Sequence, residues 1–337
     1  MDVLITGAGG RIGAELARIL VGEGHTVRAF GLAEDPRLEA VASELSIDAI
    51  AGDLTDADSL IPAVEGVDAV CHLAAALTTH DVADRLYVEV NSVGTYNLLD
   101  AVRAHAPDIE RFVYTSSDAV YWPALTGRPL YLPVDESHPL IAGSVYGATK
   151  IAAESMCRAF HRTYGIPFTV MRPTATASPS ELIDPNSPFG RRWFLASALR
   201  WLETHEPDPA DSELLARLRQ IADPEDKLLL LSDADGLASR TMITDARDVA
   251  RAMRSMIDNP EAVGEAFNVG PAAPHSDRQL VEALSDALGL EVVEVTHPSV
   301  RPSWHVSIAK ARHVLGYVPS LSVFDMVAEA TGEESPR

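Results

Sequence analysis

Short apolar runs alternate with amphipathic segments through the first half of the chain. The apolar runs cover residues 2–6, 26–30, 68–74 and 111–117. Between the first two, apolar side chains recur at i, i+4, i+7 and i+8 of a helix, at Ile12, Leu16, Ile19 and Leu20. Such a stripe is typical of a helix that packs on a core. Strands that alternate with helices of this length predict a parallel sheet with helices on both faces.

The pattern changes after Pro173, where several prolines are followed by helical patterns at 191–203 and 211–221. These patterns predict a second, smaller lobe. We therefore expect a sheet domain from residues 1–173 completed by 241–271, and a smaller mixed lobe from 174–240 plus 272–330.

The composition is that of an ordinary globular protein. The chain has 337 residues, of which 47% are hydrophobic and 23% charged, and no apolar run approaches the roughly 20 residues of a membrane span. The first residues lead directly into a predicted strand, without the features of a secretion signal, so we expect a cytoplasmic protein. We expect Cys71 and Cys157 to be inert packing residues.

The charge of the chain limits its partners. Its formal net charge of −22 argues against nucleic acid and anionic lipid as partners. The eleven histidines show no ligand spacing, so no metal is expected. Lysine occurs only at Lys150, Lys227 and Lys310, which makes a lysine inside a motif informative.

A glycine-rich turn follows the first strand. Gly7, Gly10 and Gly13 stand at three-residue intervals, and Arg11 and Ile12 open the helix that follows. Glycine here lets the backbone approach a pyrophosphate, which then sits at the positive end of the helix. The motif predicts a dinucleotide site.

The end of the second predicted strand should distinguish NAD from NADP. An acidic residue there would hold the ribose of NAD, and a basic patch would accept the 2′-phosphate of NADP. Gly31 is neither, so Glu34 or Asp35 would favour NAD, whereas Arg28 and Arg37 leave NADP open. We favour NAD.

The stretch "SVYGATK" places Tyr146 and Lys150 four residues apart. On a helix these positions lie on the same face, so both side chains can act on one small molecule. A neighbouring ammonium and the positive nicotinamide ring of a bound dinucleotide favour the phenolate, which could then accept a hydroxyl proton.

Several motifs in order resemble the sugar nucleotide epimerase/dehydratase family of extended short-chain dehydrogenases/reductases. The resemblance extends from Met1 to about Val323. It rests on the glycine turn and on "GDLTD", "HLAA", "VNSVGTYNLLDA", "YTSSDAVY", "YGATK", "MRP", "ARDVARAM", "FNVG" and "AKARHVLGYVP". It implies an α/β fold, a modified Rossmann doubly wound parallel sheet with a smaller mixed α/β substrate lobe.

The resemblance also assigns roles to residues. Tyr146 and Lys150 would be catalytic with Ser117, which is favoured over its neighbour Ser116. Asn91 would support the proton relay, with a capping or packing amide as the alternative. NAD would contact the glycine turn, Tyr146, Lys150 and the further positions Asp53, Leu54, Leu73, Ala74, Ala75, Asn91 and Pro173. The family's dehydratases carry Asp and Glu after the catalytic hydroxyl, whereas this chain has Asp118 and Ala119, which argues against dehydration.

Substrate contacts are less well defined. Ser117, Asp118 and Tyr146 would contact the reacting sugar, and a diphosphate would need arginines, for which Arg192 and Arg240 are the first candidates and Arg191 and Arg301 the others. The long helical segment 185–240 departs from the family's usual pattern, and its role stays open.

We expect an NAD-dependent epimerase of a sugar or nucleotide sugar, similar to UDP-glucose 4-epimerase, which would transiently oxidise a carbinol carbon. The alternative is an NAD(P)-dependent dehydrogenase or reductase of a free sugar, a sugar acid or another hydroxy compound. A non-catalytic cofactor-sensing regulator is a third hypothesis, although such relatives typically lose the Tyr and Lys. The resemblance further implies a homodimer joined through the helices that carry Asn91 and Tyr146.

Overall fold

The structure, a computed structural model, describes residues 1–77, 82–122, 129–204, 209–297 and 304–332. The chain divides into two compact units. Unit 1 comprises Met1–Ala175, Ala246–Gly270 and Val306–Val318, and unit 2 comprises Thr176–Asp245, Pro271–His305 and Pro319–Arg337.

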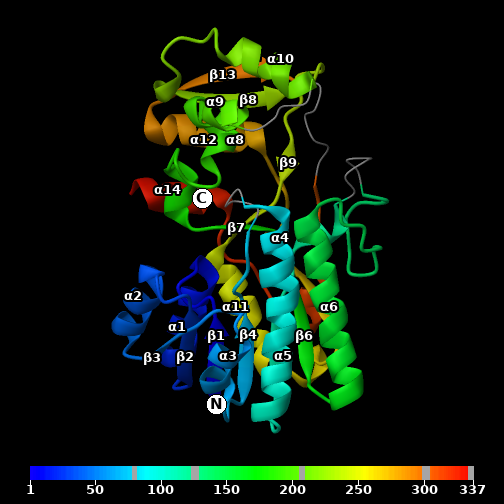
Figure 1. The fold of residues 1–337 in the computed structure, drawn as a ribbon. Coiled ribbons are helices and arrows are strands. Elements are labelled where there is room, and N and C mark those ends of the chain that lie inside the picture. The colour runs from blue at the N-terminus through cyan, green and yellow to red at the C-terminus, as the bar shows by residue number, and fades with distance from the viewer. Residues whose placement is uncertain (78–81, 123–128, 205–208, 298–303, 333–337) are drawn as a thin grey trace. The chain divides into compact units, whose positions relative to one another are not determined.

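Unit 1 is built on a seven-stranded parallel sheet (Figure 1). In order across the sheet its strands are β11 (Ala266–Val269), β6 (Phe168–Pro173), β5 (Arg111–Thr115), β4 (Ala69–His72), β1 (Asp2–Thr6), β2 (Thr26–Gly31) and β3 (Asp48–Ala51). The strand order reverses between β1 and β4, which is the arrangement of a doubly wound Rossmann sheet. The predicted fold class is confirmed.

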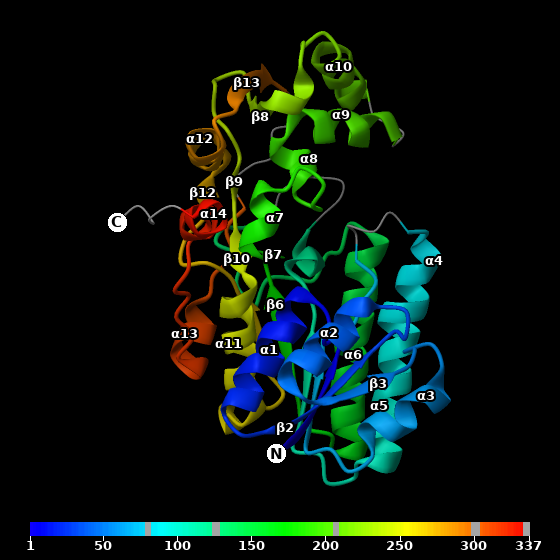
Figure 2. The same cartoon turned by 90° about the vertical axis from the view of Figure 1, so that its left-hand side faces the viewer.

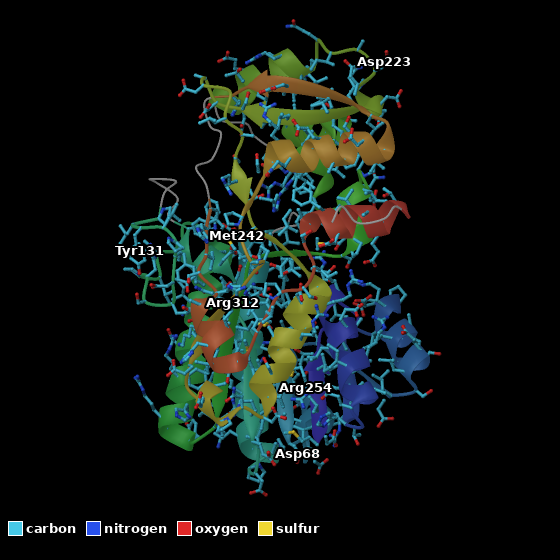
Figure 3. All side chains as sticks on the ribbon, turned by 180° about the vertical axis from the view of Figure 1, so that it is seen from behind. Asp68, Tyr131, Asp223, Met242, Arg254 and Arg312 are labelled. Atoms are coloured by element: carbon cyan, nitrogen blue, oxygen red, sulfur yellow. The ribbon has the colours of Figure 1, made fainter. Side chains whose placement is uncertain are left out.

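Helices cover both faces of this sheet. One face carries α1 (Arg11–Gly22), α11 (Ala246–Ile257) and α13 (Ala309–Leu315), which Figure 2 shows near one another and Figure 3 shows from behind, with Arg254 on α11 and Arg312 on α13 labelled. The other face carries α3 (Ala57–Val64), α5 (Gly94–His105) and α6 (Val145–Tyr164). Val3 and Ile5 of β1 face the first core and Leu4 faces the second, because successive strand residues point to opposite sides.

Further helices complete unit 1. They are α2 (Pro36–Leu45), α4 (Asp84–Tyr87), the π-helix η2 (Val88–Val93), and the 3₁₀-helices η3 (Asp118–Tyr121) and η5 (Pro260–Ala262).

Unit 2 has a core between helices and a parallel strand pair. Strands β8 (Lys227–Ser232) and β13 (Glu291–Thr296) pair with each other. Their side chains pack with α9 (Leu195–Thr204) and α10 (Pro209–Leu218) through Leu195, Leu202, Leu214, Leu229 and Val295. The other elements are β7 (Ala175–Ala177), α7 (Pro179–Ile183), α8 (Gly190–Trp193), η4 (Pro224–Asp226), β9 (Arg240–Thr241), β10 (Ile243–Asp245), β12 (His275–Ser276), α12 (Asp277–Leu288) and α14 (Val323–Thr331).

Two segments depart from the predicted division of the chain. Residues 306–318, expected in the smaller lobe, belong to unit 1, because Ala311 and Tyr317 pack in its core and the Tyr317 hydroxyl donates to the Gly270 carbonyl at 2.9 Å. Residues 241–245 belong to unit 2 instead, where β9 pairs with β12.

Candidate active site

The carboxyl ends of β1 and β4 meet where the strand order reverses, and two motifs lie there. The glycine turn follows β1, and Leu73 follows β4. Gly7 has a φ of +72°, and a Cβ on it would lie 2.8 Å from the Ala74 nitrogen. A Cβ on Gly13 would lie 2.4 Å from the Gly7 carbonyl oxygen. Both positions therefore require glycine, whereas a Cβ on Gly10 would come no closer than 3.1 Å to that oxygen.

The N-terminus of α1 lies beside this turn. Gly10 is the N-cap residue of α1 and offers no side-chain cap, and Arg11 and Ile12 are the first two helical residues. The first backbone N–H groups of a helix have no intrahelical acceptor, and they favour an anion. The turn therefore has the geometry that a pyrophosphate requires.

The loop after β4 is fastened to β1 by Thr6. The Thr6 hydroxyl accepts from the nitrogens of Leu73 and Ala74 at 3.2 Å and contacts His72 Nδ1 at 2.7 Å. His72 Nε2 lies 3.0 Å from the Thr95 hydroxyl. Burial, together with the charge of Lys150, lowers the pKa of His72 to about 3. His72 is therefore neutral and connects Thr6 of β1 with Thr95 of α5. The sequence did not predict this role.

Asp53 and Leu54 follow β3. Asp53 is exposed, and its Oδ1 accepts from the nitrogen and hydroxyl of Thr55 at 2.8 and 2.9 Å. Leu54 is buried against Gly94, where an added Cβ would lie 2.7 Å from the Leu54 Cβ. Both residues shape the turn before α3, and their contact with a cofactor stays a prediction.

The residues that could distinguish NAD from NADP separate into two groups. Arg28 bonds Asp2 at 2.5 Å and the Glu65 carbonyl at 2.8 Å, so it serves the amino end of β1 and is unsuited to a 2′-phosphate. Arg37 forms two 2.8 Å bonds with Asp35, and its backbone lies against Gly9 of the turn. Of the residues that could distinguish NAD from NADP, Asp35 and Arg37 therefore lie near the glycine turn, whereas Arg28 does not.

Tyr146 and Lys150 lie in the first turns of α6, on one face as predicted. The Ser144 hydroxyl caps this helix by accepting from the Gly147 nitrogen at 3.1 Å. A Cβ on Gly147 would lie 2.8 Å from the Ala119 carbonyl, so glycine lets the start of α6 approach η3. Lys150 Nζ donates to the Thr115 carbonyl at 3.0 Å and lies 5.7 Å from the centre of the Tyr146 ring.

Burial dominates the electrostatics of this pair. Burial raises the pKa of Tyr146 to about 12, although a hydrogen bond with Ser117 opposes the rise. Burial also lowers the pKa of Lys150 to about 7, which the charge of Glu154 opposes. The expected stabilisation of the phenolate is therefore not achieved by the protein alone, because desolvation disfavours both charged forms.

Ser117 lies beside Tyr146 at the start of η3. Its hydroxyl accepts from the Ala119 nitrogen at 3.1 Å and contacts Asp118 Oδ1 at 3.3 Å. The neighbouring Ser116 is instead buried and donates to Glu154 at 2.7 Å. Ser117 is thus the serine that the structure brings to Tyr146, as counting along the motif had predicted.

Asn91 lies in the π-helix η2 and is 1% exposed. Its Oδ1 accepts from the Ala76 nitrogen at 2.8 Å, and its Nδ2 donates to the Ala76 carbonyl at 3.1 Å and to Thr149 at 3.4 Å. The amide therefore fixes the loop after β4 against α6. A role in proton relay stays a prediction. π-Bulges are frequent at functional sites.

Pro173 is the buried last residue of β6, and the next nitrogen, that of Thr174, donates to the Val269 carbonyl at 2.9 Å. Because β6 ends between its neighbours β5 and β11, Pro173 is held at the carboxyl edge of the sheet. Its contact with the cofactor stays a prediction.

The candidate diphosphate ligands belong to unit 2. Arg192 lies 3.6 Å from Asp277, and Arg240 donates to the Pro274 carbonyl at 3.1 Å. Arg191 stacks on Trp201 at 5.0 Å, and Arg301 lies outside the described residues. Trp193 is buried and stacks on Phe189, so it is a core residue.

Within the part of the chain that the structure describes, no cluster of three or more potential ligands could hold a metal ion. Over the same residues, every helix is too short or too polar to cross a membrane.

Fold and site together define a class of protein. A doubly wound sheet, a glycine turn at the point of strand reversal, and a Tyr–Lys pair on the helix beside it are the features of a dinucleotide-dependent dehydrogenase-type enzyme. Residues 3–270 match the model of the NAD dependent epimerase/dehydratase family. The chain belongs to this family, and it is an NAD-dependent enzyme.

Relatives of known name span almost the whole chain. A UDP-glucose 4-epimerase of Halalkalibacterium halodurans is 27% identical, over 98% of this chain and 94% of the relative. A 2-alkyl-3-oxoalkanoate reductase of Stenotrophomonas maltophilia is also 27% identical, over 96% of each chain. A solved short-chain dehydrogenase/reductase of Agrobacterium tumefaciens with bound NAD is 31% identical, with a TM-score of 0.86 over 98% of this chain and 96% of that one.

Proposed function

We propose that the protein is an NAD-dependent epimerase of a sugar or nucleotide sugar, similar to UDP-glucose 4-epimerase. The observation that carries the proposal is the meeting of Tyr146, Lys150 and Ser117 at the carboxyl edge of a sheet whose glycine turn suits a dinucleotide. The UDP-glucose 4-epimerase relatives support the substrate class.

Several residues of the protein would bind the cofactor. NAD, when bound, accepts the hydride of the substrate carbinol and can return it. The glycine turn and the N-terminus of α1 would hold its pyrophosphate, while the loop at Leu73, Ala74 and Ala75 would line its cleft. Lys150 would bind its ribose and supply positive charge near Tyr146.

The proton is moved by Tyr146. Its phenolate oxygen would accept the hydroxyl proton of the substrate while the carbinol carbon is oxidised. Because burial holds the pKa of Tyr146 at about 12, positive charge from the oxidised cofactor and from Lys150 must offset desolvation. Ser117 would hold the substrate oxygen, with Asp118 beside it. Arg192 and Arg240 stay candidates for a diphosphate.

The test is incubation of the protein with NAD, and separately with NADP, against nucleotide sugars, free sugars and sugar acids, recording product isomers and reduced cofactor. We expect isomer formation without accumulation of NADH. Stoichiometric reduction of the cofactor would contradict the epimerase and support the second candidate.

That second candidate is an NAD(P)-dependent dehydrogenase or reductase of a sugar, a sugar acid or another hydroxy compound. The 2-alkyl-3-oxoalkanoate reductase, which matches over nearly its full length, favours it. A regulator without turnover is disfavoured because Tyr146 and Lys150 are both present and adjacent.

We also propose that the protein acts as a homodimer in the cytoplasm. The two cysteines are free and buried, as is usual in reducing compartments. Side chains that are apolar and exposed lie on η2, α5 and α6, the helices expected at the interface; they are Val88, Val93, Tyr96, Val145 and Tyr164. Figure 1 shows these helices on one side of unit 1.

We expect Tyr96→Asp to convert the dimer into a monomer, because a charge on α5 would be buried in the proposed contact. Sedimentation velocity measures this. Val318→Asp is the matched control, because Val318 is also exposed but lies beyond α13 on the other face of the sheet. A monomeric wild-type protein would contradict the proposal.

A further inference from the structure

One helical turn beyond Lys150, α6 carries a buried acid. Glu154 is 0% exposed, and three side chains donate four hydrogen bonds to its two oxygens. Arg172 of β6 bonds both, at 2.8 and 2.7 Å, while Ser116 donates to Oε1 at 2.7 Å and Arg158 to Oε2 at 2.9 Å. Burial raises the pKa of Glu154, but its bonds to Arg172 and Ser116 outweigh this effect and hold the pKa below its usual value. Glu154 therefore carries a fixed negative charge.

A chain of buried hydrogen bonds holds Arg172 in turn. Its second terminal nitrogen donates to the Tyr121 hydroxyl at 2.6 Å, and that hydroxyl donates to Asn268 Oδ1 at 2.8 Å. Tyr121 belongs to η3 and Asn268 to β11. A buried ion pair costs much desolvation unless every group is satisfied, and this network satisfies both partners. Glu154 is thereby held by a network that includes β6, η3, β11 and, through Ser116, the connection between β5 and η3.

Lys150 faces several titratable groups on different elements. They are Tyr146 and Glu154 of α6, Tyr114 of β5 and His72 of β4, with Arg172 of β6 held behind Glu154. Burial raises the pKa of Tyr114 well above its usual value, and His72 and Tyr146 are neutral near pH 7. Among these groups Glu154 alone bears a negative charge.

We propose that Glu154 is a positioning residue that stabilises the ammonium form of Lys150 and thereby sets the upper pH limit of turnover. This inference rests on the proposed function, in which Lys150 supplies positive charge beside Tyr146. Lys150 is 3% exposed, and burial by itself favours the neutral amine. Because the pKa of Lys150 is about 7, removal of the nearby negative charge of Glu154 would favour the neutral amine at pH 7.

The lysine content of the chain allows a direct measurement. The sequence contains only two other lysines, Lys227 and Lys310. Each forms an ion pair with a glutamate, Lys227 at 2.5 Å and Lys310 at 2.7 Å. In protein labelled with ¹³C-lysine, NMR would follow three Cε signals through a pH titration, and Lys227→Arg and Lys310→Arg would assign them. The titration requires neither cofactor nor substrate.

We expect Glu154→Gln to lower the titration midpoint of Lys150 by roughly one to two pH units, while Lys227 and Lys310 titrate as before. Glu154→Asp keeps the charge and should retain most of the wild-type midpoint. Glu44→Gln is the matched control, because it removes the acid of a two-bond Arg–Glu pair on the surface and should leave Lys150 unchanged.

Glu154→Gln leaves Arg172 buried without its partner, which could prevent folding. The double variant Glu154→Gln/Arg172→Met removes both charges and keeps the volume, so it serves if the single variant does not fold. We expect a smaller downward shift of the Lys150 midpoint in it, because the opposing charge of Arg172 is also lost. An unchanged midpoint in a folded variant of either kind would overturn the proposal.

Turnover provides the second measurement. In folded Glu154→Gln, the pH above which kcat falls should move down with the lysine midpoint, and Glu154→Asp should restore it. If Glu154 had a purely structural role, Glu154→Gln would lower kcat at all pH values without moving the pH above which kcat falls. That result would overturn the link to turnover. If no sugar is turned over, the proposed function fails, yet the NMR titration still decides whether Glu154 controls Lys150.

Discussion

Tyr146→Phe is expected to reduce turnover by about 10³-fold or more, which is within the range of general acid–base contributions, while the affinity for NAD changes little. The variant removes one hydroxyl and keeps the ring, which packs edge-on against Tyr87 at 5.9 Å. Lys150 keeps its bond to the Thr115 carbonyl at 3.0 Å. The loss should therefore appear in kcat and not in binding.

The measurement combines kcat on the substrate found by the panel with a calorimetric Kd for NAD. Tyr164→Phe is the control, because Tyr164 ends the same helix and is exposed; it should retain full activity. If Tyr146→Phe kept activity within about tenfold of wild type, general acid–base catalysis by this hydroxyl would be ruled out.

Local spacing made the core of the site predictable. The i, i+4 relation placed Tyr146 and Lys150 together, because residues one helical turn apart lie on the same face, and the family resemblance assigned Ser117. The glycine turn was predictable from its local spacing. Alternation of strands and helices likewise predicted the parallel sheet.

Contacts between distant segments were not predictable. The pairing of β8 with β13 joins residues 64 positions apart. It was missed because β8 is a short apolar run, β13 mixes valines with charged residues, and neither pattern indicates its partner strand. The segment 306–318 was assigned to the wrong unit, since the packing of Tyr317 depends on Gly270. Glu154 and Arg172 appeared as ordinary charges, because a sequence does not show burial.

Burial also governs the pKa values of the site. Spacing puts a cation near Tyr146, but the ammonium of Lys150 is itself desolvated, and it points to the Thr115 carbonyl. Burial consequently opposes both the phenolate and the ammonium. Because burial disfavours the ammonium of Lys150, the fixed negative charge of Glu154 is important for Lys150.

Gly10→Glu is expected to weaken NAD binding by about 100-fold or more, because the new carboxylate would repel the pyrophosphate across a short distance. The substitution is informative because it crowds the turn less than one at Gly13 would. A Cβ on Gly10 meets only the Gly7 carbonyl oxygen, at 3.1 Å, whereas one on Gly13 would lie 2.4 Å from the same oxygen. Loss of binding in folded Gly10→Glu would therefore report on the ligand and not on the turn.

The matched control is Gly22→Glu at the far end of α1, where an added Cβ meets nothing within 4 Å. It adds the same charge to the same helix, away from the turn, and should bind NAD as the wild type does. Isothermal titration calorimetry with NAD on both variants, with circular dichroism to verify folding, makes the comparison. Equal affinities in the two variants would remove the glycine turn from the cofactor site, and the assignment of Arg11 and Ile12 would fall with it.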